Sequence, residues 1–403
     1  MDLHSGLPYW IVKNELYDYF NPLDRDYSSE VVIIGGGITG ALIAHELCKA
    51  GFECCVIDKR TLATGSSAAS TALLQYEIDV PLCEMVDKVG KDNAVLAYQS
   101  CLQSILDIEH VLKEVGVDAE FEKKSSLFYA ANRKGLTLLK KEYEIRRMYG
   151  LPVEFLDKDQ LLDQFHFKAK GALLNRNSAQ MDVYKAATGL LKYHMDHDKL
   201  KIFSPTEIVK WDQEAEGYIL YTAEGFQVKC KHLVIAAGFE AGMFLPENVM
   251  KLTSTYAFIS YPVPPEQLWP ERCLIWETAT PYLYLRTTKD NHVIVGGEDE
   301  NFSNPAFRDR LLKKKVAKLE KKFKSLFPEI TLLPEVTWCG TFSSTDDGLP
   351  YIGCWPGLEN MYFALGYGGN GITFSMIAAQ IIRNKLKGQD DRRESVFSFQ
   401  RVI

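Results

Sequence analysis

The stretch Val31-Val32-Ile33-Ile34-Gly35-Gly36-Gly37-Ile38-Thr39-Gly40 decides the fold of this chain, because it joins an apolar strand directly to the motif G-x-G-x-x-G. An amphipathic run follows as far as Ala50, and a second apolar strand, residues 53–57, ends at Asp58. A strand, a glycine turn, a helix, a second strand and an acid, in this order, are typical of a dinucleotide-binding unit.

Each glycine of the motif has its own role in such a unit. Gly35 allows the tight turn, Gly37 lets a pyrophosphate approach the backbone, and Gly40 lets the helix pack closely on the strand. The N–H groups and the positive dipole end of the helix then face the phosphates. Asp58 lies about 20 residues further on, where a carboxylate binds ribose hydroxyls. The residues expected to contact the dinucleotide here are Gly35, Gly37, Ile38, Thr39, Gly40, Asp58 and Lys59.

The composition is that of an acidic globular protein. The chain has 403 residues, which favours two domains over one small core. Hydrophobic residues make up 46% and charged residues 25%, a balance that argues against disorder. The net charge of −7 gives no indication of nucleic-acid binding. The basic run from Lys313 to Lys324 is interleaved with apolar residues at helical spacing, so it predicts an amphipathic helix with a solvated face.

The cysteine usage and the N-terminus indicate where the protein works. Nine cysteines, an odd number without a C-x-x-C pair, indicate mostly buried thiols in a reducing compartment. The first 30 residues lack the basic and apolar regions of a signal peptide. No apolar run is long enough to span a bilayer. These features favour a cytoplasmic protein without a transmembrane segment.

Buried strands of the nucleotide-binding type recur far apart in the chain. A third one covers residues 232–238, and a fourth, residues 361–366, runs into a glycine-rich turn and a helix over 372–386. The segments between them read as β-rich, with a hairpin turn at Glu224-Gly225 and charged helices over 136–149 and 307–327. We therefore expect a discontinuous nucleotide-binding domain (1–118, 171–247 and 333–403) and a β-rich substrate domain (119–170 and 248–332).

Further motifs, in order along nearly the whole chain, resemble those of the FAD-dependent amine and D-amino-acid oxidoreductases, the group containing glycine oxidase, D-amino-acid oxidase and monomeric sarcosine oxidase. They are the small-residue loop 64–70, the strand 234–238, the segment 347–353 and the glycine-rich segment 366–371. The resemblance implies an α/β fold with FAD as its cofactor. It implies a Rossmann-like FAD-binding domain of the glutathione-reductase type with an inserted, β-rich α+β substrate domain.

The resemblance extends the expected FAD contacts to the flavin end of the cofactor. The segment 366–371 opens a helix, and its N–H groups would stabilise the negative charge that builds on the reduced ring. Cys339 matches the cysteine that tethers FAD in sarcosine oxidase, and a buried free cysteine is the alternative at this position. The further FAD-binding residues are Ser66, Ser67, Ile208, Gly238, Cys339, Gly366, Gly369 and Gly371.

A strand over residues 281–286 is the first candidate for substrate binding. Its period of two puts Tyr282, Tyr284 and Arg286 on one face and Leu283 and Leu285 on the other. Two phenols and a guanidinium suit a carboxylate. By the resemblance, Arg286 also matches the arginine that binds the substrate carboxylate in D-amino-acid oxidase and glycine oxidase. An ordinary solvent-facing strand arginine is the alternative.

The second candidate is the segment that contains Gln75, Glu77 and Asp79, which share a face if the chain is extended. In the family this region runs past the flavin ring. Two acids there favour a cationic group such as an amine or a polyamine, and surface acids on a strand are the alternative. Sarcosine oxidase carries a substrate-binding arginine near the position of Gln75, so this chain departs from a sarcosine-like site.

The reaction follows from the resemblance. It implies hydride transfer from a small amine or amino acid to flavin N5, giving an imine that hydrolyses, with O2 or a carrier as electron acceptor. Protein groups mainly orient the substrate, because the cofactor supplies the chemistry. A flavin reductase fed by NAD(P)H and a non-catalytic flavoprotein subunit stay open as alternatives. His194 and His197 lie three apart on a helix without a third ligand, so no metal site is expected.

Overall fold

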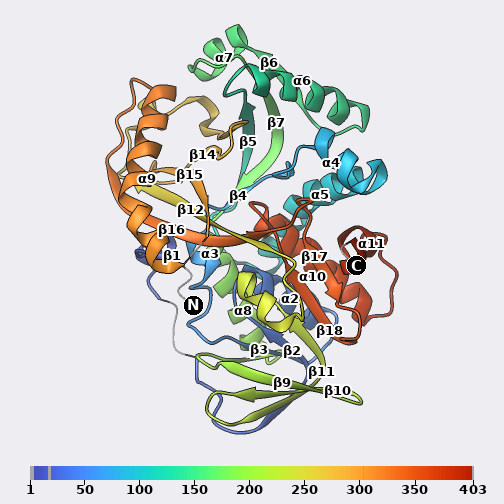
Figure 1. Cartoon of the computed structure of the whole chain (residues 1–403). Helices are drawn as coiled ribbons and strands as arrows, with labels where there is room; N and C mark the ends of the chain where they lie inside the picture. Colours follow the sequence, from blue (N-terminus) through green and yellow to red (C-terminus); the bar gives the residue numbers. More distant parts are fainter. Residues whose placement is uncertain (1–3, 17–19, 303, 402–403) are drawn as a thin grey trace.

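The computed structural model describes residues 4–16, 20–302 and 304–401, which form two large β-sheets with helices packed against them (Figure 1). The eight-stranded sheet lies at the bottom of Figure 1 and the ten-stranded sheet above it. The segments of both sheets come from many places along the chain. The sheets therefore define a discontinuous architecture of the kind that the sequence predicts.

The eight-stranded sheet has a parallel core. Its order is β17 (Tyr351–Cys354), β18 (Met361–Leu365), β11 (Gln227–Ile235), β2 (Tyr27–Ile34), β3 (Cys54–Ile57) and β8 (Leu200–Phe203), with β10 (Gly217–Thr222) on β11 and β9 (Ile208–Glu214) on β10. The pairs from β18 to β8 are parallel, and β17 runs antiparallel. The buried strands expected at 31–34, 53–57, 232–238 and 361–366 are confirmed.

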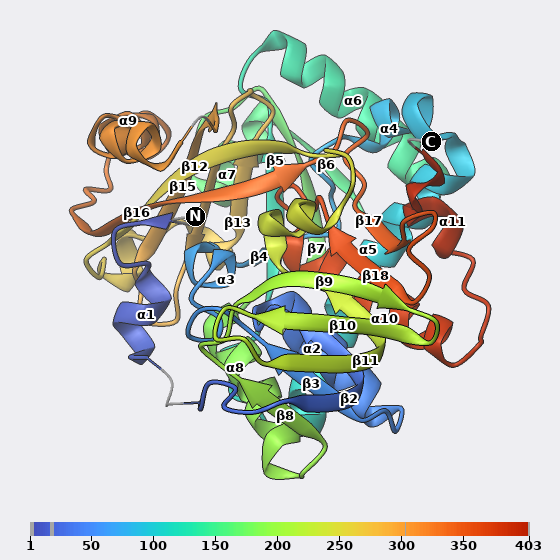
Figure 2. The same ribbon diagram turned by 60° about the horizontal axis from the view of Figure 1, so that its bottom comes forward.

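Alternation along β2 explains how this sheet is covered. Val31 and Ile33 join the core shared with helices α2 (Ile38–Lys49), α5 (Lys91–Val115), α8 (Val183–Asp196) and α10 (Gly371–Leu386). Val32 and Ile34 point to the opposite face, where they share a core with β10. The hairpin of β9 and β10 covers that face in Figure 2. The expected hairpin turn at Glu224-Gly225 joins β10 to β11.

The ten-stranded sheet is mostly antiparallel. Its order is β1 (His4–Ser5), β16 (Pro334–Ser344), β12 (Lys251–Ser260), β15 (Val293–Asn301), β14 (Leu283–Thr287), β13 (Leu274–Glu277), β5 (Glu122–Tyr129), β7 (Gly171–Gln180) and β4 (Leu73–Leu74), with β6 (Glu154–Asp157) on β7. Tyr256, Leu285 and Val295 project from one face of it and pack on Leu319 and Phe323 of α9 (Pro305–Leu326). The other face is turned to the eight-stranded sheet.

Four strands of this sheet come from ranges that the sequence assigned to the nucleotide-binding domain, the short β1 and β4 from 1–118 among them. The strands β7 and β16 pair within the ten-stranded sheet, although the sequence assigned 171–247 and 333–403 to the nucleotide-binding domain. The pairing partners of these strands are distant in sequence, so no local pattern identifies the sheet to which they belong. The domain boundaries themselves stay a prediction.

The remaining elements are short or lie outside the two sheets. They are α1 (Tyr9–Asn14), α3 (Ser66–Ala69), α4 (Leu82–Val89), α6 (Arg133–Met148), α7 (Lys158–Phe165), α11 (Glu394–Phe397) and the 3-10 helices η1 (Gly238–Phe244), η2 (Pro265–Gln267), η3 (Pro270–Arg272) and η4 (Phe399–Arg401). The helices expected at 136–149 and 307–327 are confirmed as α6 and α9. Lys315 departs from the expected solvated face of α9, because it is buried and bonds Glu300 at 2.7 Å.

The cysteines and the helices agree with the expectations from composition. All nine cysteines are free, and all except Cys83 and Cys354 are buried. Within the described part of the chain, no helix is both long and apolar enough to cross a lipid bilayer.

Candidate active site

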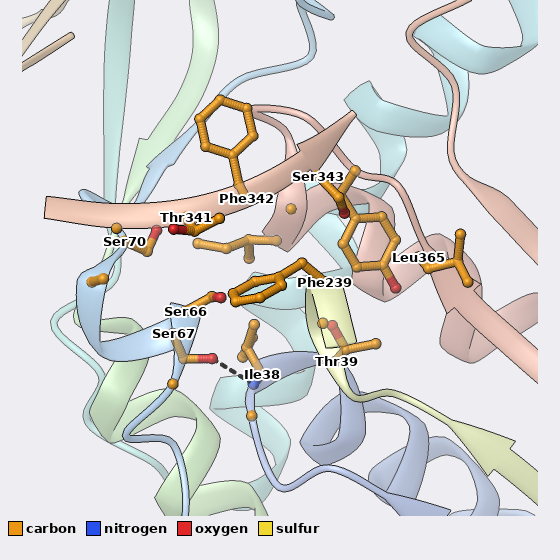
Figure 3. A pocket seen from close by; sticks show the side chains of 18 of the residues that line it. Ile38, Thr39, Ser66, Ser67, Ser70, Phe239, Thr341, Phe342, Ser343 and Leu365 are labelled. Atoms are coloured by element: carbon orange, nitrogen blue, oxygen red, sulfur yellow. Dashed lines mark hydrogen bonds between the residues drawn. The ribbon is translucent and has the colours of Figure 1, made fainter. Parts of the chain in front are cut away.

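A large cavity lies between the two sheets. One end of it is walled by the start of α2, the end of β3 and η1, and the other end by strands β12 to β16 of the ten-stranded sheet. Figure 3 shows the middle of this space, where α3, β16 and the start of α2 meet. The cavity therefore brings the predicted nucleotide-binding motif and the predicted substrate strand into one continuous site.

The glycine turn at the first end has the geometry that the motif predicts. Gly35 has a φ of +110°, which glycine adopts without strain. A Cβ on Gly40 would lie 1.8 Å from the Gly35 carbonyl oxygen, so α2 packs on β2 only because Gly40 has no side chain. Asp58 accepts hydrogen bonds from the N–H groups of Gly36 at 2.7 Å and Arg60 at 2.8 Å. Burial raises the pKa of Asp58, and these two bonds oppose the rise.

The small-residue loop closes over the start of α2. The Ser67 hydroxyl accepts a hydrogen bond from the Ile38 N–H at 2.9 Å, the dashed line in Figure 3. Ser66 and Thr39 face the same space, and the Phe239 ring lies between them in this view. Thr39 also bonds the Ser375 hydroxyl at 2.8 Å, which ties α2 to α10. These contacts form a polar cradle around the N-terminus of a helix.

The expected cofactor residues gather on this cavity with two exceptions. Lys59 lies at the nucleotide end, where its ammonium bonds Glu240 at 2.9 Å. Gly40 and Cys339 do not line the cavity, and Gly40 acts through helix packing instead. The expected residues that do line it are Gly35, Gly37, Ile38, Thr39, Asp58, Lys59, Ser66, Ser67, Ile208, Gly238, Gly366, Gly369 and Gly371.

Cys339 does not support a covalent tether. Its side chain is fully buried in the core beneath α9, together with Tyr256 and Phe258. The thiol donates a long hydrogen bond to Asp309 Oδ1, at 3.7 Å, and burial raises its pKa to about 11. A thiol in this place is protonated and poorly nucleophilic. The alternative of a buried free cysteine describes this position.

The far end of the cavity contains the predicted aromatic residues. Tyr282 and Tyr284 line it, and the Tyr282 hydroxyl donates to Asp79 Oδ1 at 3.2 Å. The Tyr284 hydroxyl lies 3.1 Å from that of Thr255 on β12. Gln75 also lines the cavity, with its amide donating to the Ser126 hydroxyl at 2.8 Å. The structure thus brings three of the four predicted substrate residues together.

Arg286, the fourth, does not reach the cavity. It is 3% exposed, and its Nη1 donates to the carbonyl oxygens of Thr71 and Ala72 at 2.9 Å each and of Met181 at 3.1 Å. Its guanidinium also lies over the Trp10 ring, 5.5 Å from the centroid. The backbone at Thr71 and Ala72 separates it from the cavity, and the carbonyl oxygens there and at Met181 accept the N–H groups of Nη1. The predicted carboxylate clamp is therefore not supported by this geometry.

The acids of the far end differ in their partners. Glu77 is buried and pairs with Arg146 at 3.3 Å and with the Asn175 amide. Asp79 accepts the Gly369 N–H at 2.6 Å in addition to the Tyr282 hydroxyl. Asp299 on β15, which the sequence did not single out, also lines the cavity. Burial, together with the Asp79 carboxylate, raises the pKa of Asp299 to about 7.

The cavity lining is short of cations. Among the described residues that form it, Lys59 is the only lysine, arginine or histidine. His194, considered above for a metal, lies 3.0 Å from His45 instead, and His197 bonds the Tyr193 carbonyl. Within the described residues, no group of three or more His, Cys, Asp or Glu side chains is arranged to hold a metal ion.

Sequence reasoning missed several residues of the far end besides Asp299. Thr255, Trp276 and Phe342 line it, from β12, β13 and β16. They lie on three strands that are distant in sequence, and none carries a local motif. For Asp299 one signal existed, the Gly296-Gly297 pair just before it, because glycines inside a strand often mark a bulge.

Comparisons with known proteins agree with this geometry. Residues 30–384 match the family model described as FAD dependent oxidoreductase. The chain is 25% identical to a glycine oxidase of Geobacillus kaustophilus, over 91% of this chain and 94% of that one. It is 24% identical to the gamma-glutamylputrescine oxidoreductase of Escherichia coli, over 95% and 89% of the two chains. The fold matches the crystal structure of glycine oxidase from Geobacillus kaustophilus with a TM-score of 0.78, at 21% identity, over 94% of this chain and 100% of the other.

Proposed function

Because the chain belongs to the family of FAD-dependent oxidoreductases, we propose that it oxidises the C–N bond of a small amine that carries a positive charge and no carboxylate beside its nitrogen. The proposal joins two parts of the cavity. One part fits the cofactor of the family, and the other fits a cation. The carrying observation is the charge of the far end, where carboxylates are present and no arginine or lysine stands among the described residues of the wall.

The residues at the first end fit FAD. Gly35 and Gly37 leave the backbone open at the start of α2, where unpaired helix N–H groups attract a pyrophosphate. Asp58 and Ile208 line the part of the wall that would hold the adenosine, and segment 366–371 would hold the flavin end. When bound there, FAD supplies the acceptor for the two electrons that leave the substrate.

The carboxylates of the far end favour a cationic substrate. Asp79 and Asp299 line the same space, and burial raises the pKa values of both carboxylates. A substrate carboxylate placed here would be desolvated next to like charges, which is costly. An ammonium group would instead complete the charge balance. An amine is therefore a better substrate for this cavity than an amino acid with its carboxylate beside the reacting carbon.

The aromatic side chains of the far end favour the same class. Trp276 stacks on Phe128 with ring centroids 3.7 Å apart, and the ring of Tyr282 lies 6.3 Å from that of Trp276. Tyr284 lies 5.7 Å from Tyr282. Faces of such rings attract ammonium groups, most strongly where water is excluded. Apolar walls with a few carboxylates and aromatic faces form a suitable site for a small organic cation.

The names of two relatives show that the family includes both kinds of substrate. One is named glycine oxidase, for an amino acid, and the other gamma-glutamylputrescine oxidoreductase, for an amine. The acidic far end of this cavity supports the second kind of substrate. Either O2 or a carrier would then take the electrons from the reduced cofactor, and neither acceptor is favoured by a particular residue of the cavity.

An anaerobic absorbance titration of the FAD-loaded protein tests the proposal with matched ligand pairs. Each pair consists of an amine and the amino acid that differs from it only by a carboxylate, such as butylamine with norvaline and benzylamine with phenylglycine, in both enantiomers. We expect the amines to bleach the flavin absorbance and the amino acids to leave it unchanged. Bleaching by the amino acids alone would reject the proposal, and bleaching by NADH alone would favour a flavin reductase.

A further inference from the structure

We propose that Asp299 is the residue that takes the proton from the substrate's ammonium group, so that the nitrogen is neutral when its C–H bond breaks. The inference rests on the proposed function and deepens it, because it assigns a catalytic role within the same cavity. An irregularity in strand β15 turns this side chain toward the cavity.

A β-bulge places Asp299 in the cavity. In the pairing of β12 with β15, Ser254 faces Glu300 and Tyr256 faces Gly297, so Thr255 alone faces the two residues Glu298 and Asp299. A regular strand would put residues 293, 295, 297 and 299 on one face, beneath α9. The extra residue of the bulge reverses this order after Gly297. Asp299 therefore faces the cavity, where a regular strand would have buried it under the helix.

The residue before Asp299 shows that the bulge is held in place. Glu298 has a φ of +58°, a left-handed conformation that costs energy in a residue with a side chain. Its carboxylate bonds three lysines of α9, Lys322 at 2.9 Å, Lys318 at 3.2 Å and Lys315 at 3.6 Å. The helix α9 lies along these strands in Figure 1. The lysines thus stabilise a strained backbone whose effect is to aim Asp299 at the substrate.

The neighbours of Asp299 leave one of its oxygen atoms for a ligand. Oδ1 is shielded from solvent and has no hydrogen-bond partner among the described residues. The Thr255 hydroxyl interacts with the carboxylate and lies 3.1 Å from the Tyr284 hydroxyl. A Cβ on Gly296 would lie 2.2 Å from the Tyr284 ring, so this glycine makes room for the ring across the strand. A buried carboxylate oxygen without a partner is a suitable acceptor for an ammonium N–H.

The charges around Asp299 are suited to a proton acceptor. Burial and the carboxylates of Asp79 and Glu298 raise its pKa to about 7, and Thr255 and Lys315 oppose the rise. A base that titrates near the working pH is efficient, because it is deprotonated before the reaction and still accepts a proton readily. Asp79 lacks this freedom, since both of its oxygens are hydrogen-bonded, to Gly369 and to Tyr282.

Asp299 and the substrate nitrogen exchange one proton in this step. One N–H bond of the substrate ammonium breaks, an O–H bond forms on Asp299, and the nitrogen keeps the electron pair. That pair becomes the C=N bond when the adjacent carbon loses its hydrogen with two electrons, for which the family's FAD is the oxidant. Asp299 acts only on the proton, so its effect is separable from the electron transfer.

The first test compares kcat/KM for an amine across pH in the FAD-loaded wild type, Asp299→Asn and the control Glu266→Gln, whose side chain is exposed on η2. In the wild type we expect kcat/KM to rise through a pKa near 7. In Asp299→Asn we expect kcat/KM at pH 7 to fall about 100-fold or more and this pKa to disappear. The control should keep the wild-type profile.

The second test counts the protons that amine binding releases, without turnover, and so shows whether Asp299 is the group that titrates against the amine. The probe is tert-butylamine, which has no hydrogen on the carbon beside its nitrogen and so resists oxidation. Calorimetric titrations in buffers of different ionisation enthalpy count the protons released on binding. Below a pH of about 7 we expect the wild type to release nearly one proton per bound amine. Above it, and in Asp299→Asn at either pH, we expect almost none.

The outcomes separate this inference from the proposed function. If the wild type oxidises amines while Asp299→Asn keeps kcat/KM within twofold and the same pH profile, the role of Asp299 is overturned and amine oxidation stands. If proton release persists in Asp299→Asn, the role of Asp299 is overturned as well. If no amine bleaches the wild-type flavin, the proposed function fails and the inference falls with it.

Discussion

Replacing Arg286 with leucine separates two roles for this residue. The sequence predicted a clamp for a substrate carboxylate, whereas the structure places the guanidinium against three backbone carbonyls outside the cavity. A clamp affects substrate binding and a structural cross-link affects stability. We expect Arg286→Leu to destabilise the protein and to leave KM for amines within about twofold once the folded fraction is taken into account.

The size of the effect follows from the contacts. Removing the guanidinium leaves the carbonyl oxygens of Thr71, Ala72 and Met181, which are buried or partly buried, without their hydrogen-bond donor. Each carbonyl left without a donor costs about 1–3 kcal/mol of stability, so the three together cost about 3–9 kcal/mol. Burial of the charge opposes this stabilisation, since it lowers the pKa of Arg286 from 12.5 to about 10. At about 1.4 kcal/mol per pKa unit, that opposition is about 3 kcal/mol. The middle of the range for the three carbonyls is about 6 kcal/mol, and subtracting the opposing burial cost leaves a net loss of stability of about 3 kcal/mol.

Urea unfolding of the FAD-loaded protein, followed by tryptophan fluorescence, measures this loss. Arg176→Leu is a matched control, because Arg176 has half of its side chain exposed and makes only surface ion pairs with Glu154 and Glu271. Its removal should change the unfolding free energy by less than about 1 kcal/mol. The reasoning is refuted if Arg286→Leu unfolds at the wild-type urea concentration and raises KM tenfold or more.

Three further predictions concern the cofactor and pH. Gly40→Ala places a Cβ 1.8 Å from the Gly35 carbonyl oxygen, so we expect it to purify with little FAD, measured as the ratio of flavin to protein absorbance. Cys339 is a buried thiol, so acid precipitation should release all of the flavin into solution; flavin that stays with the wild-type pellet and leaves it in Cys339→Ser would contradict this. Burial lowers the pKa values of His45 and His194 to about 4. The unfolded state then binds more protons, so stability should decrease as the pH falls from about 6.5 to about 4, and less steeply in His194→Leu.

The nucleotide-binding end was predictable because its signals are local. The residues from Gly35 to Asp58 carry a turn, a helix start and an acid within one stretch of chain, and each has a separate physical requirement. The continuous apolar runs of β2, β3, β11 and β18 likewise indicate buried parallel strands without reference to their neighbours. Their observed ends lie within a few residues of the expected ones.

The substrate end was predictable only in part. The alternation of side chains along a strand gives the face on which a residue lies, but not where the end of a long side chain is. It placed Leu283 and Leu285 on one face and Tyr282 and Tyr284 on the other, and in the structure these faces are the core and the cavity. It could not show that the side chain of Arg286 ends beneath another segment of backbone. Nor could it find Asp299, since the bulge reverses the alternation just before that residue.

Asp79 has a consequence for the order in which ligands bind. One of its oxygens accepts a hydrogen bond from Tyr282, just before β14 at the proposed substrate end, and the other from Gly369, in the segment that would meet the flavin. A single carboxylate therefore belongs to two binding sites at once. By thermodynamic reciprocity, any amine that shifts Asp79 must change the affinity for the cofactor by the factor by which the cofactor changes the affinity for that amine. We therefore expect the affinity for the cofactor and the affinity for the amine to be coupled, so that a change in one is accompanied by a change in the other.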